Sequence, residues 1–169
     1  FARAGVEAPL LFKAVVSEGM QKMPRFTAQN LSMTVWAFAR AGANAPFAND
    51  VNASALFRAV SAESLKKMGT FTPQQLANTA WAFAKAQSEA GATAHMLKAP
   101  LLFDALATES AKKISLFNPQ ELASIVWAYA KAGVDAPLLF EAVATEVPKK
   151  MASFNAQDLA NTAWAFATA

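Results

Sequence analysis

The apolar positions of residues 73–86 follow a helical spacing and separate into two arcs on a helical wheel. Trp81 lies at the margin of the apolar arc, and Ala82 falls within the polar arc, where it leaves a shallow gap. The pattern predicts a helix with one buried side and one side open to solvent. The apolar arc consists of Leu76, Ala77, Ala80, Phe83 and Ala84, and the polar arc consists of Gln74, Gln75, Asn78, Ala82 and Lys85.

This pattern occurs four times along the 169-residue chain. Each copy has a Phe followed 24 residues later by a Trp, and the segments around the Trp are nearly identical: TVWAFARAG, TAWAFAKA, IVWAYAKAG and TAWAFATA. Self-similarity at this period is typical of stacked helical repeats. We therefore predict an all-α fold, a right-handed α-solenoid of antiparallel helix hairpins with a unit of about 37 residues. The four pairs are Phe12–Trp36, Phe57–Trp81, Phe103–Trp127 and Phe140–Trp164.

The predicted solenoid spans residues 1–169 as one array. The chain begins and ends inside a unit, so we interpret it as a window from a longer array and expect any targeting segment to lie outside it. Successive Trp residues are 45, 46 and 37 positions apart, so two units carry extra residues, near 47–54 and 87–98. We expect these to lengthen surface loops, through neutral drift or for a contact. The units are 1–26 (partial), 27–71, 72–117, 118–154 and 155–169 (partial).

Each unit has signals for two helices, which we call helix A and helix B. Helix A begins after a capping residue, with Pro at its first position in two units, as in Thr72-Pro73 and Asn118-Pro119. Gly42 and Gly133 are suited to end helix A. Helix B opens at Pro9, Pro100 or Pro137, and we expect Pro148 to kink or shorten the last one.

A Glu precedes a Lys by four positions in every helix B, which is the favourable order for a pair on a helix surface. Such a pair contributes only about 0.2–0.5 kcal/mol. We interpret these lysines as residues for salt bridges and solubility. The pairs are Glu18–Lys22, Glu63–Lys67, Glu109–Lys113 and Glu146–Lys150.

Composition narrows the possible functions. The chain has no Cys, one His at position 95, no Gly-rich phosphate loop and no metal-spaced cluster, so we expect neither an enzyme nor a cofactor or metal site. No apolar run approaches the length of a membrane span. The net charge of +3 permits a polyanionic partner without requiring one.

The third and sixth positions of helix A vary between units while staying mostly polar, and they are neighbours on the helix surface. Base reading by helical repeats requires a pair of side chains that differs between repeats while the rest of the helix surface stays the same. A capping box is the simpler explanation for Gln75 and Glu121 at the third position. The four candidate base-reading pairs are Asn30 with Met33, Gln75 with Asn78, Glu121 with Ser124, and Asp158 with Asn161.

A basic residue recurs in the last turn of helix A and is a candidate contact for the phosphate backbone. The helix dipole alone also accounts for a cation at this position. Thr168 breaks the pattern in the last unit. The candidates are Arg3, Arg40, Lys85 and Lys131.

The phrase Phe-x-Pro-Gln-x-Leu-Ala-Asn-x-x-Trp-Ala-Phe-Ala at residues 71–84 resembles the octotricopeptide repeat, and the 37-residue unit is close to the related heptatricopeptide type. The resemblance covers the whole chain. It implies sequence-selective binding of single-stranded RNA in the chloroplast or mitochondrion, for transcript stability, processing or translation. Protein partners in a ribonucleoprotein complex would also fit.

A protein-interaction scaffold built on the same solenoid is the alternative. The low net charge and the carboxylates of Glu121 and Asp158 at the third position favour it. The two functions differ in salt dependence, because phosphate neutralisation makes RNA affinity fall steeply with salt.

Overall fold

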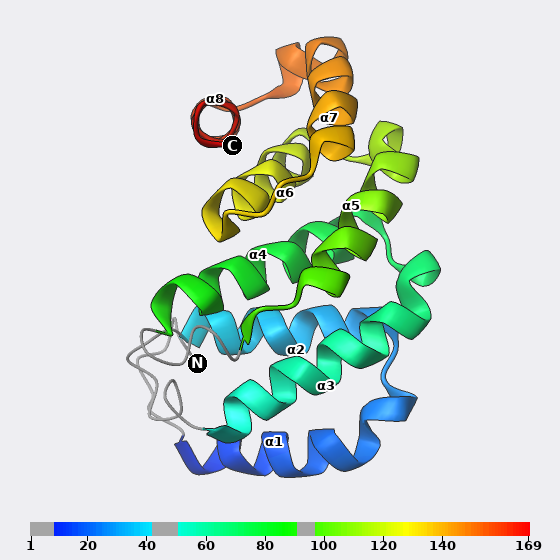
Figure 1. The fold of residues 1–169 in the computed structure, drawn as a ribbon, viewed down its shortest axis with the longest axis vertical. Coiled ribbons are helices and arrows are strands. Elements are labelled where there is room, and N and C mark those ends of the chain that lie inside the picture. Colours follow the sequence, from blue (N-terminus) through cyan, green and yellow to red (C-terminus); the bar gives the residue numbers. More distant parts are fainter. Residues whose placement is uncertain (1–8, 42–50, 91–96) are drawn as a thin grey trace.

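The computed structural model describes residues 9–41, 51–90 and 97–169 (Figure 1). Within these ranges the secondary structure is helical and no strand is present. Short 3-10 turns (Met23–Arg25, Met68–Thr70, Ile114–Leu116 and Met151–Ser153) each precede the next helix A. The α-helices are α1 (Pro9–Lys22), α2 (Ala28–Ala41), α3 (Val51–Lys67), α4 (Pro73–Glu89), α5 (Pro100–Lys113), α6 (Pro119–Ala132), α7 (Pro137–Lys150) and α8 (Ala156–Thr168).

The helices form two layers, and the chain alternates between them (Figure 1). Helices α2, α4, α6 and α8, the predicted A helices, pack side by side in what we call the A layer. Helices α1, α3, α5 and α7, the predicted B helices, pack in the same order in the B layer. Each A helix also contacts the B helix that follows it, α2 with α3, α4 with α5 and α6 with α7. The contacts of the A layer are the more extensive, which fits its alanine-rich helices.

Aromatic pairs connect the two layers and explain why the Phe-to-Trp spacing is constant. The Phe in the first turns of each B helix meets an aromatic ring near the end of the next A helix, edge to face, the favoured geometry. Any insertion within this block would separate the two rings. The pairs are Phe12–Phe38, Phe57–Phe83, Phe103–Tyr129 and Phe140–Phe166, with centroids 5.0, 5.0, 5.2 and 5.1 Å apart.

Tyr129 differs from its three Phe counterparts by a buried hydroxyl group. The hydroxyl donates a hydrogen bond to the carbonyl oxygen of Phe103, 2.5 Å away. Burial raises the pKa of Tyr129 well above its ordinary value of 10, and the negative charge of Asp104 adds to the effect.

The predicted start and stop signals of the helices are confirmed where the structure describes them. Helix α4 begins with a capping box formed by Thr72 and Gln75, and α6 with one formed by Asn118 and Glu121. Helix α6 ends at Ala132 and is capped by Gly133, whose φ of 62° lies in the left-handed region that favours glycine. Gly42 lies outside the described residues. Helices α1, α5 and α7 begin at Pro9, Pro100 and Pro137 as expected.

The sequence predicted that Pro148 would kink or shorten the last B helix, and the helix is not shortened. Helix α7 continues to Lys150 and has 14 residues, as does α5. Pro148 is in the last turn, where its missing N–H costs a single hydrogen bond. The turn is also held by Lys150, whose ammonium group bonds to carbonyl groups of the turn before α6.

Part of each lengthened segment is helical rather than loop. Helix α3 begins at Val51, earlier relative to its Phe than the other B helices, and α4 continues to Glu89. Residues 51–54 and 87–89 were expected in loops and instead extend these two helices. Their alanine, serine and glutamine side chains are compatible with a helix. Of the other insert residues, 47–50 and 91–96 lie outside the described residues.

The lysine at the end of α3, α5 and α7 does more than form a surface salt bridge. Lys113 Nζ donates to the carbonyl oxygens of Gly69 and Phe71, at 2.9 and 2.8 Å, and pairs with Glu109 at 2.9 Å. These carbonyl groups belong to the turn between α3 and α4. Lys67 bonds in the same way to Pro24 and Phe26, and Lys150 to Ser115 and Phe117. The interpretation of these lysines as solubility residues is therefore incomplete.

The carboxylates in these lysine bridges are largely buried and are stabilised in the charged form. Hydrogen bonds from neighbouring lysines hold the pKa of Glu63, Glu109 and Glu146 below the ordinary value of 4.5. The hydrogen bond from Lys113 lowers the pKa of Glu109 the most. The hydrogen bonds from Lys66 and Lys149 have the largest effect on the pKa of Glu63 and Glu146, respectively. Burial acts in the opposite direction and is outweighed.

Among the described helices, none combines the length and the apolar character that crossing a membrane would require.

Candidate nucleic-acid interface

The outer face of the A layer carries most of the residues that the sequence singled out. Helix α4 exposes only a narrow ridge there, made by Gln74 and the half-buried Asn78, Trp81 and Lys85. The glutamine at the second position is exposed in all four A helices (Gln29, Gln74, Gln120 and Gln157). We call this surface the A face.

Ala82 is not part of the A face, contrary to the prediction from the helical wheel. Its side chain is fully buried, as are those of Ala128 and Ala165 at the same position of α6 and α8. A helical wheel describes a single helix and cannot show contacts with its neighbours. Each of these helices packs against the A helix before it, and this contact buries the alanine. Ala37 takes this position in α2, which has no A helix before it among the described residues, and it is exposed.

The tryptophans at the ninth position of the four A helices lie on the A face in two couples, and we call them together the tryptophan row. Trp36 and Trp81 are 6.5 Å apart between ring centroids, and Trp127 and Trp164 are 6.2 Å apart, with ring planes tilted by 36° and 37°. Trp36 and Trp164 are 41% and 42% exposed, and the two inner indoles are half-buried. The row supplies accessible aromatic surface that the sequence alone left undecided.

The third-position side chains are engaged in capping the helices. The side chains of Gln75, Glu121 and Asp158 accept hydrogen bonds from the backbone N–H of the capping residue, at 3.0, 2.9 and 3.3 Å. Asn30 accepts from the N–H and the hydroxyl group of Thr27. Asp158 is also buried. The capping explanation thus accounts for the contacts of all four residues, and their base reading stays a prediction.

The sixth-position side chains are less engaged. Among the described residues, Asn78, Ser124 and Asn161 have no side-chain hydrogen bond, and each is half-buried on the A face. Met33 is 58% exposed and lies 3.8 Å from Nε2 of Gln29. Three polar groups are therefore available to a ligand without breaking an existing bond.

The last-turn cations lie beside the tryptophan row. The guanidinium carbon of Arg40 is 6.0 Å from the ring centroid of Trp36, and Lys85 Nζ is 5.9 Å from that of Trp81. Lys85 also pairs with Glu89 in the last turn of α4. These contacts place positive charge against indole faces. Arg3 lies outside the described residues.

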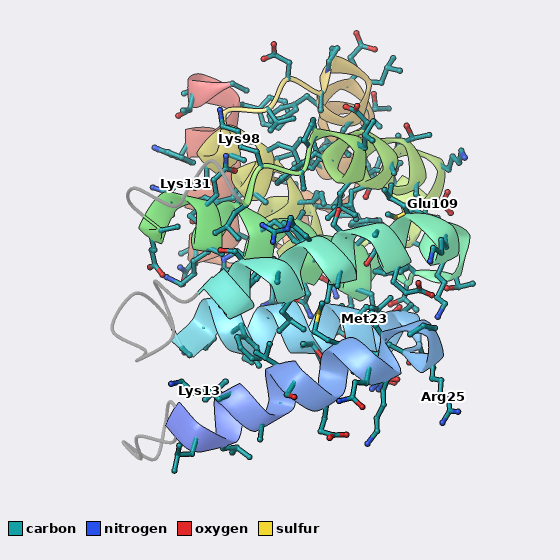
Figure 2. All side chains as sticks on the ribbon, turned by 60° about the horizontal axis from the view of Figure 1, so that its bottom comes forward. Lys13, Met23, Arg25, Lys98, Glu109 and Lys131 are labelled. Atoms are coloured by element: carbon teal, nitrogen blue, oxygen red, sulfur yellow. The ribbon has the colours of Figure 1, made fainter. Side chains whose placement is uncertain are left out.

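Lys131 is exposed and forms no ion pair among the described residues. Figure 2 shows it on the same side of the molecule as Lys13 and Lys98, away from Glu109 and Arg25. That side is the one where the A helices end and the B helices begin. Lys131 is therefore the candidate phosphate contact that requires the least rearrangement.

The tryptophans are the site residues that sequence reasoning undervalued. Their signal was present, because all four occupy the ninth position of helix A, next to the second-position glutamine on a helical wheel. Whether such a residue is buried depends on how closely neighbouring A helices pack, which one helix does not reveal.

The described residues contain no group of three or more His, Cys, Asp or Glu side chains that could hold a metal ion. His95 lies outside them. Comparison with known protein families found no family model that matches this chain, and comparison with curated proteins found no significantly similar protein.

Proposed function

We propose that this chain is a right-handed α-solenoid that binds single-stranded RNA on its A face. The observation that carries the proposal is the row of four tryptophans, which lies beside cations and beside polar side chains with no other partner. RNA bases stack on aromatic rings in proteins that bind single strands, and each stack contributes about 1–3 kcal/mol.

The proposed contacts divide into three kinds. The indoles would stack on bases, and Arg40, Lys85 and Lys131 would neutralise phosphates. The side chains of Asn78, Ser124 and Asn161 would provide selectivity, since each lies near the indole row and has free hydrogen-bonding groups. Third-position residues would read a base only by giving up their cap, so we assign selectivity first to the sixth position.

The biological setting of the proposal comes from the octotricopeptide resemblance. It suggests that the target is an organellar transcript, in the chloroplast or mitochondrion, whose stability, processing or translation depends on the bound protein. Nothing in the binding chemistry itself requires a reaction, so we propose a binding protein rather than an enzyme.

Fluorescence anisotropy with a pool of randomised single-stranded RNA tests the proposal. Three neutralised phosphates predict that affinity falls about twentyfold between about 50 and 200 mM salt. Arg40→Ala and Lys131→Ala should each reduce this salt dependence, while Arg25→Ala, which removes an exposed cation on the opposite side of the molecule from Lys131, should not. Equal effects of all three substitutions, or equal affinity for double-stranded RNA, would contradict the proposal.

One observation favours the alternative of a protein-interaction scaffold. Leu10, Leu101 and Leu138 are highly exposed at the same position of α1, α5 and α7 in the B layer. Beside Leu101, a cavity of about 260 Å³ between α3 and α5 is lined mainly by apolar side chains. A protein bound there would leave the A face free. If the chain binds a protein partner, and this binding is insensitive to salt and lost in Leu101→Glu, the scaffold function would be supported.

A further inference from the structure

The cavity between α3 and α5 combines apolar walls with two cations. Its volume is about 260 Å³, and its buried lining residues include Phe57, Phe83 and Leu102. Arg58 and Lys98 also line it, and both are exposed, so their charges lie at the solvent side of the cavity. All of its lining residues belong to the described part of the chain. The cavity therefore offers an apolar interior and positive charge together.

The protein itself does not neutralise these two cations. Among the described residues, Arg58 and Lys98 take part in no ion pair and no side-chain hydrogen bond. By contrast, Lys66 and Lys112 each pair with a glutamate of their own helix. A cleft lined by charge of one sign concentrates ligands of the opposite sign. The cavity is therefore suited to an anion.

The equivalent positions of the next helix pair carry the opposite charge. Asp104 of α5 takes the place of Arg58, because each directly follows the phenylalanine in the first turns of its helix. Asp135 takes the place of Lys98, because each lies two residues before the proline that opens a B helix. The paired cations are therefore not part of the constant frame of the repeat. They are specific to the cavity between α3 and α5.

The lining also limits the chemistry of the ligand's body. Apart from the two cations, Ser61 is the one polar lining residue, so a sugar or nucleoside would lose its hydrogen bonds to water without replacement. Leu65 and Leu101 line the cavity and are 36% and 70% exposed. They stay open because α3 and α5 make the least extensive contact of any two neighbouring B helices. A hydrocarbon body would remove both leucines from water.

The volume of the cavity sets the size of the ligand. It lies just below the range of about 300–1,000 Å³ that is typical of pockets for drug-sized molecules. At about 30 Å³ for a group of the size of a water molecule or a methylene, the cavity holds roughly nine such groups.

We propose that the cavity between α3 and α5 binds a medium-chain fatty acid, a carboxylate with an unbranched chain of about eight to ten carbons. The chain lies against Phe57 and Leu102, and the carboxylate faces Arg58 and Lys98. The guanidinium group of Arg58 can donate two parallel hydrogen bonds to a carboxylate, and Lys98 adds a second positive charge. No lining residue belongs to the A face, so this site is independent of the proposed RNA binding.

Isothermal titration calorimetry of the chain with decanoate, below the concentration at which micelles form, tests the proposal. One decanoate should bind per chain, and hexanoate should bind at least about tenfold more weakly, because it buries four fewer methylene groups. Decylamine has the same chain with a positive head group, and it should also bind at least about tenfold more weakly. No binding of decanoate, or equal binding of decylamine, would overturn the proposal and leave the cavity to the scaffold alternative.

A charge-reversed variant tests the role of the two cations. Arg58→Asp combined with Lys98→Asp gives the cavity the charges of the next helix pair, so it should weaken decanoate binding about tenfold or more and strengthen decylamine binding. Both positions are exposed, and circular dichroism should show unchanged folding. Arg25→Ala removes an exposed cation far from Lys98 (Figure 2) and should leave decanoate binding unchanged. Equal loss in Arg25→Ala, or no loss in the double variant, would overturn the proposal.

A filled variant tests the role of the cavity itself. Ser61→Phe places a large side chain in the cavity and keeps both cations, so it should abolish decanoate binding. Ser61 is half-exposed, so its melting temperature should stay close to that of the natural chain. Decanoate binding that persists in this folded variant would show adsorption outside the cavity and would overturn the proposal.

Discussion

Lys113 Nζ lies 2.8 Å from the carbonyl oxygen of Phe71, although the two residues are 42 positions apart in the chain. The bond joins the end of α5 to the turn that precedes α4, so a lysine that looks like half of a local ion pair fixes two segments of the fold. Glu109 holds the ammonium group in position from within the same helix. The same arrangement at Lys67 and Lys150 gives the recurring Glu and Lys a structural reason.

Replacing this lysine should cost far more stability than replacing its exposed counterpart. Lys113→Met removes two hydrogen bonds from a charged donor to backbone carbonyl groups, so we expect a loss of about 2 kcal/mol in the free energy of unfolding. Lys22→Met removes only an exposed pair and should cost at most about 0.5 kcal/mol. Urea unfolding of both variants checks this, and equal losses would contradict a bridging role.

The buried carboxylates should make the fold sensitive to acid. The folded-state pKa of Glu63, Glu109 and Glu146 is below the ordinary 4.5, so the unfolded chain binds more protons as the pH falls. Their stabilisation is complete above that value and is lost as the pH falls through the lower folded-state pKa. Urea unfolding over a series of pH values should show a shallower acid dependence in Glu109→Gln than in Glu18→Gln. The same slope in both would argue against this account.

Tyr129 should resist ionisation in alkali. Its pKa is raised by burial, and it is the single tyrosine of the chain, so ultraviolet absorbance reports it without overlap from another phenol. We expect phenolate to appear only together with loss of the helical circular dichroism signal. In concentrated urea the titration should return to the ordinary value of about 10. Phenolate formed near that value in the folded chain would show that the hydroxyl is accessible.

An exposed tryptophan should matter more for RNA than for stability. Trp164 is 42% exposed, and if it stacks on a base, Trp164→Ala should weaken RNA binding about tenfold, equivalent to about 1.4 kcal/mol. Anisotropy titrations would measure this, with Leu138→Ala in the B layer as the matched change of an exposed apolar residue. RNA affinity that is unchanged in Trp164→Ala would remove the tryptophan row from the proposed interface.

Two buried serines should be replaceable without loss. The hydroxyl oxygens of Ser64 and Ser110 are buried and have no hydrogen-bond partner. The equivalent residue in α7 is the apolar Val147, which is also buried. Ser110→Ala removes an unsatisfied polar group, so we expect unchanged stability or a gain of up to about 1 kcal/mol in thermal or urea unfolding. A clear loss would mean that the hydroxyl has a partner, such as bound water.

The features that the sequence predicted well are local. A capping residue such as Thr72, a proline such as Pro100 and a glycine such as Gly133 act within a few residues, so their effects could be read directly. The constant Phe-to-Trp spacing likewise indicated four similar units. The reason for that spacing, the aromatic pairs between the two layers, became clear only in the structure.

The features that the sequence did not predict depend on neighbouring helices. Ala82 is buried by packing between A helices, and Lys113 is occupied by carbonyl groups of a distant turn. Neither contact leaves a signal within one helix. The candidate site was predicted only in part. Gln75 and Glu121 were correctly suspected of capping, because a cap is local, while the accessibility of the tryptophan row depends on the spacing between helices.

The two tryptophan couples have an optical consequence. Indole rings whose centroids are 6.5 and 6.2 Å apart lie within the range where their electronic transitions interact, and the tilt between the rings gives that interaction a handedness. Each couple joins two adjacent A helices, so its exciton circular dichroism depends on how those helices are spaced. The four tryptophans are the only ones in the chain. Circular dichroism in the indole bands therefore reports the spacing of the A helices without an added label.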